Sequence, residues 1–473
     1  MNNNQKKKFK LGMPDAFVII FSIIVLAAIS TYLIPAGSYE RETIDGVTKV
    51  VPNSYSVIDS NPTGFLELFT SIQVGLIQSA NIIFLIFVIG GIVRVIESTG
   101  AIDSGINTLI VKTKGRYMVL ITSVAAIFGL LASMGLASNA VIAFIPIGIA
   151  LARSLKLDAI VGISTIYLGY FSGMIAGIFD PTILGLAQTI AELPLFSGMP
   201  LRIVIFIALL TITIIYTNLY AKKIKNDPKK SIMGDKPFGT LEDELEDAGN
   251  LDDKPAVFTT LQKAVLLSFV SFIGIFIYGA FTKGWGVNEL VGIFLIMGMF
   301  IAMIARITPN DFVKIFIDGA RSITYGALVV GLARAVIVIM ENGHVMDTIV
   351  NAALAPLQSV SVYAGGLLLF VFNLLFNLLV TSGTGQAAIV MPVMVPLVDM
   401  LGITRQTGAL AFMLGDGITN IIAPTSGVLM AVLAVGGVRW TQWIRYAFPL
   451  MLMWIVVGAI AICYAIFTGY GPF

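Results

Sequence analysis

Three ionisable residues lie inside otherwise apolar stretches and are the first candidates for chemistry. Asp180 precedes a proline, Asp416 stands between two glycines, and Arg334 lies within the apolar run from Ile323 to Met340. A charge at bilayer depth costs about 2.5–3.5 kcal/mol on insertion scales, so such a residue is a functional candidate. A carboxylate can hold a cation or a proton, and a guanidinium can bind a carboxylate.

Each of the three residues has a functional interpretation and an alternative. The flanking glycines of Asp416 would open the backbone where a coupling ion or an ammonium group could bind. Asp180 either takes part in ion coupling or caps a half-helix that starts at Pro181. Arg334 either binds a substrate carboxylate or neutralises one of the aspartates.

Neutral polar residues gather where apolar segments are interrupted. Half-helix N-termini at such interruptions carry partial positive charge and free N–H groups, which suit a carboxylate. The predicted substrate-binding residues are Ser138, Asn139, Ser382, Thr384, Gln386, Asp416, Asn420, Thr425 and Arg334. The ion-coupling candidates are Asp180, Asp416 and Asn139, and sodium could bind at Ser138, Asn139 and Thr384. A lone Ser or Thr can instead bond to its own helix, and the coupling ion, Na⁺ or H⁺, stays open.

The composition places these residues in a membrane. Of 473 residues, 57% are apolar and 12% charged, with a mean hydropathy of +0.93, whereas soluble domains are about 45–50% apolar and about 25% charged. A net charge of +2 provides no basic face for nucleic acid. We expect the lipid bilayer and a small solute as partners.

The same composition argues against most enzyme chemistry. One histidine, His344, and one cysteine, Cys463, cannot build a zinc cage or a Cys-His pair. No Gly-x4-Gly-Lys-[Ser/Thr] motif supports an ATP-driven pump. We expect no catalytic residue and no cofactor besides a coupling ion. The enzyme alternative is an intramembrane aspartyl protease that uses Asp180 and Asp416 as a shared-proton pair.

Apolar runs predict many transmembrane helices, since about 20 residues cross the hydrocarbon. The uninterrupted candidates are Ala16 to Ala36, Ile82 to Ile96, Ile203 to Tyr220, Ala264 to Phe281, Leu290 to Ala305, Ile323 to Met340 and Trp443 to Phe467. The first follows several lysines, and its length favours an uncleaved helix over a signal peptide.

Four further segments are interrupted, and they form a repeating pattern. Breaks at 137–140 and 381–386 predict helical hairpins that enter the membrane and turn back, and breaks at 171–182 and 415–425 predict discontinuous spans. Irregular backbone at this depth needs protein or a watery cavity around it. The order hairpin, then broken span, occurs twice about 245 residues apart, with Pro146 matching Pro392.

The predicted fold class is an all-α polytopic membrane protein of two inverted repeats, each with a re-entrant hairpin and a discontinuous helix. Four crossings per repeat and one extra helix between the repeats give the inversion. The predicted parts are a cytoplasmic N-terminus (1–14), a first repeat (15–222) with an external loop (37–66), a cytoplasmic linker (223–258), an extra helix (259–285) and a second repeat (286–473).

Lysine and arginine placement predicts the orientation. With the N-terminus in the cytoplasm, the outer loops hold only Arg41, Lys49, Arg202, Lys283 and Arg405, and the C-terminus is external. Within the external loop, Asp45-Gly46 between alternating residues predicts a β-hairpin. The linker, Lys222 to Lys254, passes from Lys-rich to acidic, which predicts a mobile, solvated segment, with a regulatory contact as the alternative.

Several motifs resemble one transporter family. They are Thr381-Ser-Gly-Thr-Gly-Gln-Ala-Ala with Met391-Pro, Gly415-Asp-Gly with Pro424-Thr-Ser, Met13-Pro-Asp, and Asp318-Gly-Ala-Arg. The chain resembles the YfcC-like branch of the DcuC and arginine/ornithine (basic amino acid) antiporter family, in the ion transporter superfamily. The resemblance implies a dimeric secondary carrier of the bacterial inner membrane, an elevator-type movement, and basic amino acids or four-carbon dicarboxylates as substrates.

One motif departs from the relatives. Some of them carry Gly-Glu-Glu at the first hairpin tip, whereas this chain has Ala137-Ser-Asn-Ala, which is more similar to the Ser-Asn-Thr signature of sodium-coupled dicarboxylate carriers. Asp180, where some relatives have Asn, only partly restores the lost acids. We therefore expect a small carboxylate-bearing solute, first an amino acid whose ammonium meets Asp416, and as the alternative a dicarboxylate coupled to Na⁺ or H⁺.

Overall fold

The protein is mainly helical, with four short strands. The computed structural model describes residues 16–44, 47–51, 54–101, 104–105, 108, 116–135, 141–180, 182–241, 259–283, 285–354 and 360–471. The helices of the first half are α1 (Ala16–Leu33), α2 (Phe65–Gln78), α3 (Ala80–Ser98), α5 (Tyr117–Ser133), α6 (Val141–Ser154), α7 (Ala159–Ile163), α8 (Gly169–Ala176), α9 (Ile183–Ile190) and α10 (Met199–Asn226). Those of the second half are α12 (Thr260–Lys283), α13 (Val287–Ile304), α14 (Pro309–Ser322), α15 (Thr324–Asn342), α16 (Met346–Leu354), α17 (Val362–Phe376), α18 (Gly383–Leu401), α19 (Arg405–Asn420), α20 (Gly427–Val435) and α21 (Trp440–Phe467).

The seven uninterrupted apolar runs are all helices, as predicted. Within the described residues, six helices are long and apolar enough to cross a membrane, and α15 with α16, bent by 76°, would make a seventh span. Large apolar side chains such as Val204 of α10 and Ile460 of α21 are exposed. A surface of this kind would be costly in water and suits lipid.

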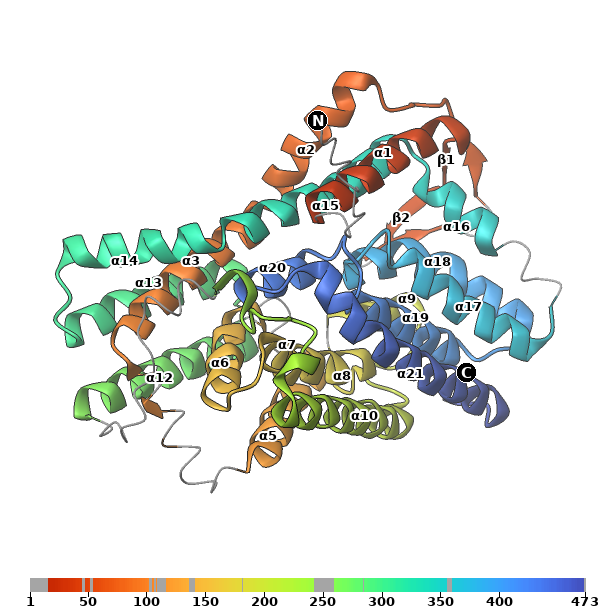
Figure 1. Ribbon diagram of the computed structural model, residues 1–473. Helices are drawn as coiled ribbons and strands as arrows, with labels where there is room; N and C mark the ends of the chain where they lie inside the picture. The colour runs from red at the N-terminus through yellow and green to blue at the C-terminus, as the bar shows by residue number, and fades with distance from the viewer. Residues whose placement is uncertain are drawn as a thin grey trace, which may run out of the picture.

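The helices form two groups that face each other. The first layer contains α1, α2, α3 and α12 to α15, where α3 packs on α14 and α13, and α2 on α15. The second layer contains α5 to α10 and α17 to α21, where α8 packs on α5, and α19 on α17. Figure 1 shows α3, α13 and α14 at the left, apart from α17, α19 and α21 at the right. Helix α20 of the second layer contacts α15 and α3 of the first layer as well as α6.

The same order of elements occurs in both halves of the chain. Each of three contacts between the halves has a counterpart in which the corresponding helices exchange roles. The pair α2 and α15 matches α3 and α14, the pair α1 and α15 matches α13 and α3, and the pair α9 and α18 matches α20 and α6. Pro146 lies inside α6 and Pro392 inside the corresponding α18. Reciprocity of this kind is expected of two halves related by a two-fold axis.

Two predicted interruptions are present but begin later in the chain than expected. The helix from Ala159 runs through a π-helical turn (Ser164–Leu168) to Ala176, and α19 runs unbroken through Asp416 to Asn420. These helices end at Ala176 and Asn420, and the next helices begin at Ile183 and Gly427. The prediction that Asp416 lies in a break is therefore wrong.

The glycines beside Asp416 explain this error, because they serve packing. A Cβ on Gly415 would lie 2.3 Å from Cβ of Asn373 in α17, and one on Gly417 would lie 2.4 Å from Cγ1 of Ile175 in α8. Both distances are far below van der Waals contact. The glycines let α19 approach its neighbours closely, as small residues do between membrane helices.

The linker prediction is wrong for residues 227–241, which pack against the second layer. Tyr220 Oη and Ser231 Oγ each donate to Oδ2 of the buried Asp158 at 2.6 Å. Met233 and Phe238 are buried, and the N–H of Thr240 donates to the carbonyl of Gly437. Two short 3₁₀ turns, Pro228–Lys230 and Gly239–Leu241, complete the segment. Residues 242–258, which hold the acidic run, lie outside the described residues.

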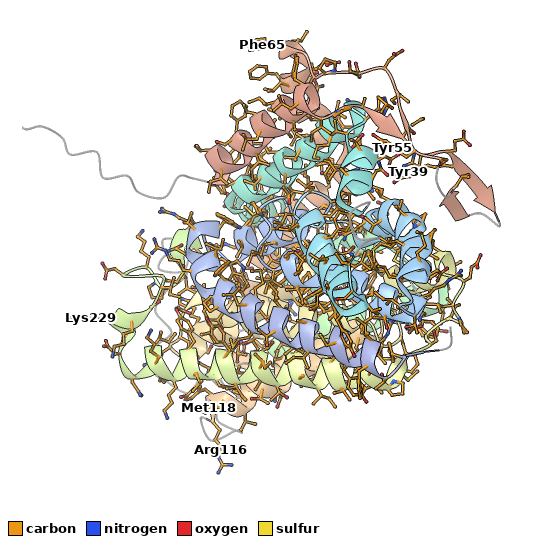
Figure 2. All side chains as sticks on the ribbon, turned by 90° about the vertical axis from the view of Figure 1, so that its right-hand side faces the viewer. Tyr39, Tyr55, Phe65, Arg116, Met118 and Lys229 are labelled. Carbon is orange, nitrogen blue, oxygen red and sulfur yellow. The ribbon has the colours of Figure 1, made fainter. Side chains whose placement is uncertain are left out.

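The predicted β-hairpin is present. Strand β2 (Arg41–Ile44) pairs antiparallel with β3 (Val47–Val50), and Asp45-Gly46, at the expected turn, lie outside the described residues. Strands β1 (Gly37–Ser38) and β4 (Ser56–Val57) form a second antiparallel pair. Figure 2 places Tyr39 and Tyr55, beside these strands, at the opposite end of the molecule from Lys229, which follows α10.

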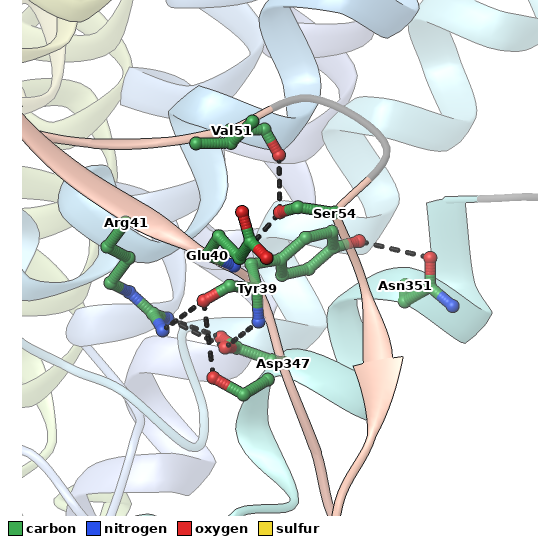
Figure 3. Close-up of polar contacts among 8 residues, drawn as sticks. Tyr39, Glu40, Arg41, Val51, Ser54, Asp347 and Asn351 are labelled. Atoms are coloured by element: carbon green, nitrogen blue, oxygen red, sulfur yellow. Dashed lines mark hydrogen bonds and ion pairs between the residues drawn. The ribbon is translucent and has the colours of Figure 1, made fainter.

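A polar network connects the segment between α1 and α2 to α16 (Figure 3). Nη2 of Arg41 donates to both carboxylate oxygens of Asp347, at 2.7 and 2.8 Å, and the N–H of Tyr39 donates to Oδ2 of Asp347 at 3.0 Å. The hydroxyl of Tyr39 donates to Oδ1 of Asn351. Burial, with the nearby Asp347 charge, raises the pKa of Tyr39 to about 12, so this hydroxyl remains a donor at neutral pH.

Removing Asp347 is expected to destabilise the protein more than removing Arg41. Asp347→Ala deletes the ion pair and leaves the buried N–H of Tyr39 without its acceptor, at a cost of about 1–3 kcal/mol. Arg41→Ala deletes a partly exposed pair worth at most about 1 kcal/mol. Thermal unfolding of both variants and the double variant measures this difference. Equal losses in the two single variants would contradict the assigned role of Asp347.

Candidate functional site

A cavity of about 490 Å³ lies between the two layers. From the first layer it is lined by the junction of α2 and α3 and by α15, and from the second by α8, α9, α18, α19 and α20. Its polar lining residues are Gln78, Ser79, Tyr170, Thr182, Arg334, Thr381, Ser382, Thr384, Asn420, Thr425 and Ser426.

The cavity brings together five of the predicted substrate-binding residues: Ser382, Thr384, Asn420, Thr425 and Arg334. Gln386, Asp180 and Asp416 are buried nearby but are not in its wall. Ser138 and Asn139, with the whole first hairpin tip, lie outside the described residues. Gly135, immediately before that tip, lines the cavity.

Three helices of the second layer begin at this cavity. Ser382 caps α18 by accepting from the N–H of Gly385, and Ser426 caps α20 by accepting from the N–H of Leu429. Thr182 and Ile183, at the start of α9, are also in the wall. The first N–H groups of a helix and its dipole favour negative charge, so three such ends favour an anion.

Arg334 adds the only formal charge in the described lining. Its Nε donates to Oε1 of Gln78 at 2.9 Å, which holds the guanidinium at the end of α2. No ion pair between Arg334 and an acidic residue occurs in the described part of the chain. Of its two predicted roles, binding a carboxylate therefore fits the geometry better than neutralising an aspartate.

Asp180 performs the capping role that its sequence position allowed. Its Oδ1 accepts from the N–H of Thr182 at 2.8 Å, from the hydroxyl of Thr182 at 2.6 Å and from the N–H of Ile183 at 3.3 Å. This carboxylate oxygen fixes the start of α9 at the cavity. An oxygen so occupied is a poor member of the shared-proton pair that an aspartyl protease needs.

Asp416 lies directly behind the cavity wall. It is fully buried in α19, and neither carboxylate oxygen has a hydrogen-bond partner. A Cβ on Gly383, the first residue of α18, would lie 2.9 Å from Oδ2 of Asp416. Because Gly383 lines the cavity, only the N-terminus of α18 separates this carboxylate from it.

Threonines around the cavity satisfy carbonyls that the helix breaks set free. The hydroxyl of Thr425 donates to the carbonyl of Leu378, and that of Thr381 to the carbonyl of Thr425. Thr419 donates in the same way to the carbonyl of Leu374. These bonds meet the need for protein partners at a break within the membrane, so the predicted residue Thr425 has a structural role at the site.

Sequence reasoning missed several polar residues in this region. Arg202, predicted in an outer loop, is fully buried in α10, where its Nη1 donates to the carbonyl of Gly177. Asn373 and Asn377, four residues apart at the end of α17, are fully buried beside α19. The spacing of these two asparagines in an apolar run was a usable signal, because it places both on one helix face.

Comparisons with known proteins agree with a transporter. Residues 13–467 match a family described as DcuC, the C4-dicarboxylate anaerobic carrier. An Escherichia coli (strain K12) protein named "Putative basic amino acid antiporter YfcC" is 30% identical over 97% of both chains. An "Uncharacterized protein" of Haemophilus influenzae is 28% identical over 96% of this chain and 97% of its own.

Two solved transporters are distantly similar. The YdaH transporter of Alcanivorax borkumensis is 18% identical, with a TM-score of 0.43 over 97% of this chain and 100% of its own. MtrF of Neisseria gonorrhoeae, described as one of a class of antimetabolite efflux pumps, is 15% identical, with a TM-score of 0.43 over 98% of this chain and 97% of its own. The apolar helices and the whole-length family match together identify a multi-pass membrane protein, and the chain belongs to the DcuC family of carriers.

Proposed function

We propose that this secondary transporter carries a small carboxylate-bearing solute, and that its substrate is an anion. The observation that carries the proposal is the charge of the cavity. Among the described lining residues Arg334 is the one cation and none is acidic, and three helix N-termini meet there. The first hairpin tip, residues 136–140, contains no acidic residue either.

This charge favours a four-carbon dicarboxylate over a basic amino acid. A dicarboxylate can place one carboxylate at Arg334 and the other at the N-termini of α18 and α20. A basic amino acid would bring net positive charge beside Arg334, and Asp416, a buried acid without a hydrogen-bond partner among the described residues, lies behind Gly383. The name of the family points to dicarboxylates and that of the Escherichia coli relative to basic amino acids, and the cavity favours the former.

Transport would proceed by an elevator-type movement of the second layer against the first. The reciprocal contacts between the halves support two inverted repeats, and the position of the cavity between the layers supports relative motion there. The N-termini of α9, α18 and α20 would then move, while Arg334 and Gln78 stay with the first layer. We propose an inner-membrane location with a cytoplasmic N-terminus and an external C-terminus, and a homodimer by family resemblance.

Counterflow in proteoliposomes tests the substrate class. Vesicles loaded with unlabelled succinate are expected to accumulate labelled succinate, and external arginine or ornithine should not compete. The purified chain is the only protein needed, and protein-free vesicles are the control. Exchange of arginine for ornithine without a response to succinate would contradict the anionic substrate and favour the amino acid antiporter.

A further inference from the structure

Behind the cavity wall lies a cluster of buried oxygens that no donor reaches. Within the described residues these are both carboxylate oxygens of Asp416, Oε1 of Gln386, and Oδ1 of Asn377 and Asn420. A buried acceptor without a donor costs about 1–3 kcal/mol, and a charged one costs more. A ligand shared by several of these atoms would remove that cost.

The orphan oxygens belong to one connected region of α17, α18 and α19, which pack on one another. Gln386 lies one turn after Gly383, against which Oδ2 of Asp416 rests. Asn420 lies one turn after Asp416 in α19, so the two share a helix face. Asn377, at the C-terminal end of α17, bonds to Thr419, three residues after Asp416.

Hydrogen bonds indicate which end of the Gln386 and Asn377 amides is free. Nε2 of Gln386 donates to the carbonyl oxygen and to Oδ1 of Asn373, at 3.4 and 3.0 Å, so its oxygen is the free end. Nδ2 of Asn377 donates to the hydroxyl of Thr419 at 2.8 Å, and that hydroxyl donates onward to the carbonyl of Leu374. A flip of the Gln386 amide would set acceptor against acceptor. A flip of the Asn377 amide would take the Thr419 hydroxyl away from the carbonyl of Leu374.

We propose that the oxygens of Asp416, Gln386 and Asn377 form a sodium site, with Asn420 linking it to the cavity. A proton on Asp416 would reach one acceptor and leave the amide oxygens without donors. A small monovalent cation binds several oxygens at once and neutralises the carboxylate. Hard cations of this kind prefer carboxylate and amide oxygens.

The site differs from the sodium position that the sequence suggested at Ser138, Asn139 and Thr384. Its role as the coupling site rests on the proposed transport function, whereas sodium binding itself does not. An ion at Asp416 would lie behind the N-terminus of α18, the helix end that we assign to a substrate carboxylate. The ion would thereby offset the negative field of Asp416, which otherwise repels an anionic substrate.

Sodium binding to the purified protein, without substrate, tests the site. Isothermal titration with sodium chloride, with choline chloride at constant ionic strength as reference, is expected to show saturable binding. Asp416→Asn should weaken sodium binding about tenfold or more, because the site loses its only negative charge. Asn377→Leu should also weaken it and should lower the sodium-free melting temperature only slightly, because it removes an oxygen without a donor together with one hydrogen bond, to Thr419, whose hydroxyl still donates to Leu374.

Asp158→Asn is the matched control. Asp158 is also a buried aspartate, but its oxygens have donors in Tyr220, Ser231 and Val161, and it lies far along the chain from the cluster. Its variant is expected to bind sodium as the wild type does. The proposal is overturned if the wild type binds no sodium, if Asp416→Asn binds it unchanged, or if Asp158→Asn loses it equally. Succinate exchange without sodium binding would remove this site alone, and sodium binding without succinate exchange would remove the proposed substrate alone.

Discussion

Arg334→Gln is expected to lower succinate exchange by roughly 10-fold to 150-fold. Hydrogen bonds to charged groups contribute about 1.5–3 kcal/mol, and Arg334, which is half-buried, is the only cation in the described lining. Arg334→Lys should recover part of the exchange, because lysine keeps the positive charge but lacks the planar guanidinium group that can donate two parallel hydrogen bonds to a carboxylate. Initial rates of counterflow at several substrate concentrations measure the loss.

Arg94→Gln provides the control for this experiment. Arg94 belongs to α3, in the same layer as Arg334, and its Nη1 lies 3.6 Å from Oε2 of Glu97. It is not among the residues that line the cavity described above. Its variant is expected to exchange succinate at the wild-type rate. If Arg334→Gln also transported normally while folding normally, Arg334 would not be the carboxylate anchor.

Gly173→Val is expected to cause the largest loss of stability. A Cβ at Gly173 in α8 would lie 1.8 Å from the carbonyl oxygen of Gly129 in α5 and 2.9 Å from the N–H nitrogen of Ser133. Both obstacles are backbone atoms, which cannot rotate away, so the two helices would have to separate. Overpacking of this kind costs about 3 kcal/mol and should lower the melting temperature by roughly 3 °C or more.

The same substitution at an open glycine separates this effect from helix propensity. A Cβ on Gly274 of α12 meets nothing within 4 Å, so Gly274→Val is expected to melt within a degree or two of wild type. Melting followed by size-exclusion chromatography after heating measures both variants. Similar behaviour of the two would mean that α5 and α8 do not pack as closely as described.

Long apolar runs made much of this architecture predictable. Hydrophobicity alone located seven helices, because a membrane span needs a fixed length of apolar chain. The β-hairpin was equally accessible, because Asp45-Gly46 between alternating residues favours a tight turn. Five predicted site residues meet at the cavity for a related reason: polar residues in apolar segments are tolerated mainly where they face protein or water.

The exact breaks could not be predicted, because glycine serves two purposes. Gly415 and Gly417 suggested an open helix around Asp416, yet they allow close packing against α17 and α8. Only the tertiary arrangement distinguishes the two uses. Arg202 was misplaced for a similar reason, since its burial depends on the positions of Gly177 and other distant residues.

The docked start of the linker has a mechanical consequence. Residues 227–241 are fastened to the second layer through Asp158 and Gly437, whereas Thr260 begins α12 in the first layer. If the layers slide, the chain between Leu241 and Thr260 is one of the covalent connections between the moving layer and the stationary one. The fully extended length of this connection then sets an upper limit on how far the second layer can move relative to the first, whatever side chains lie at the binding site.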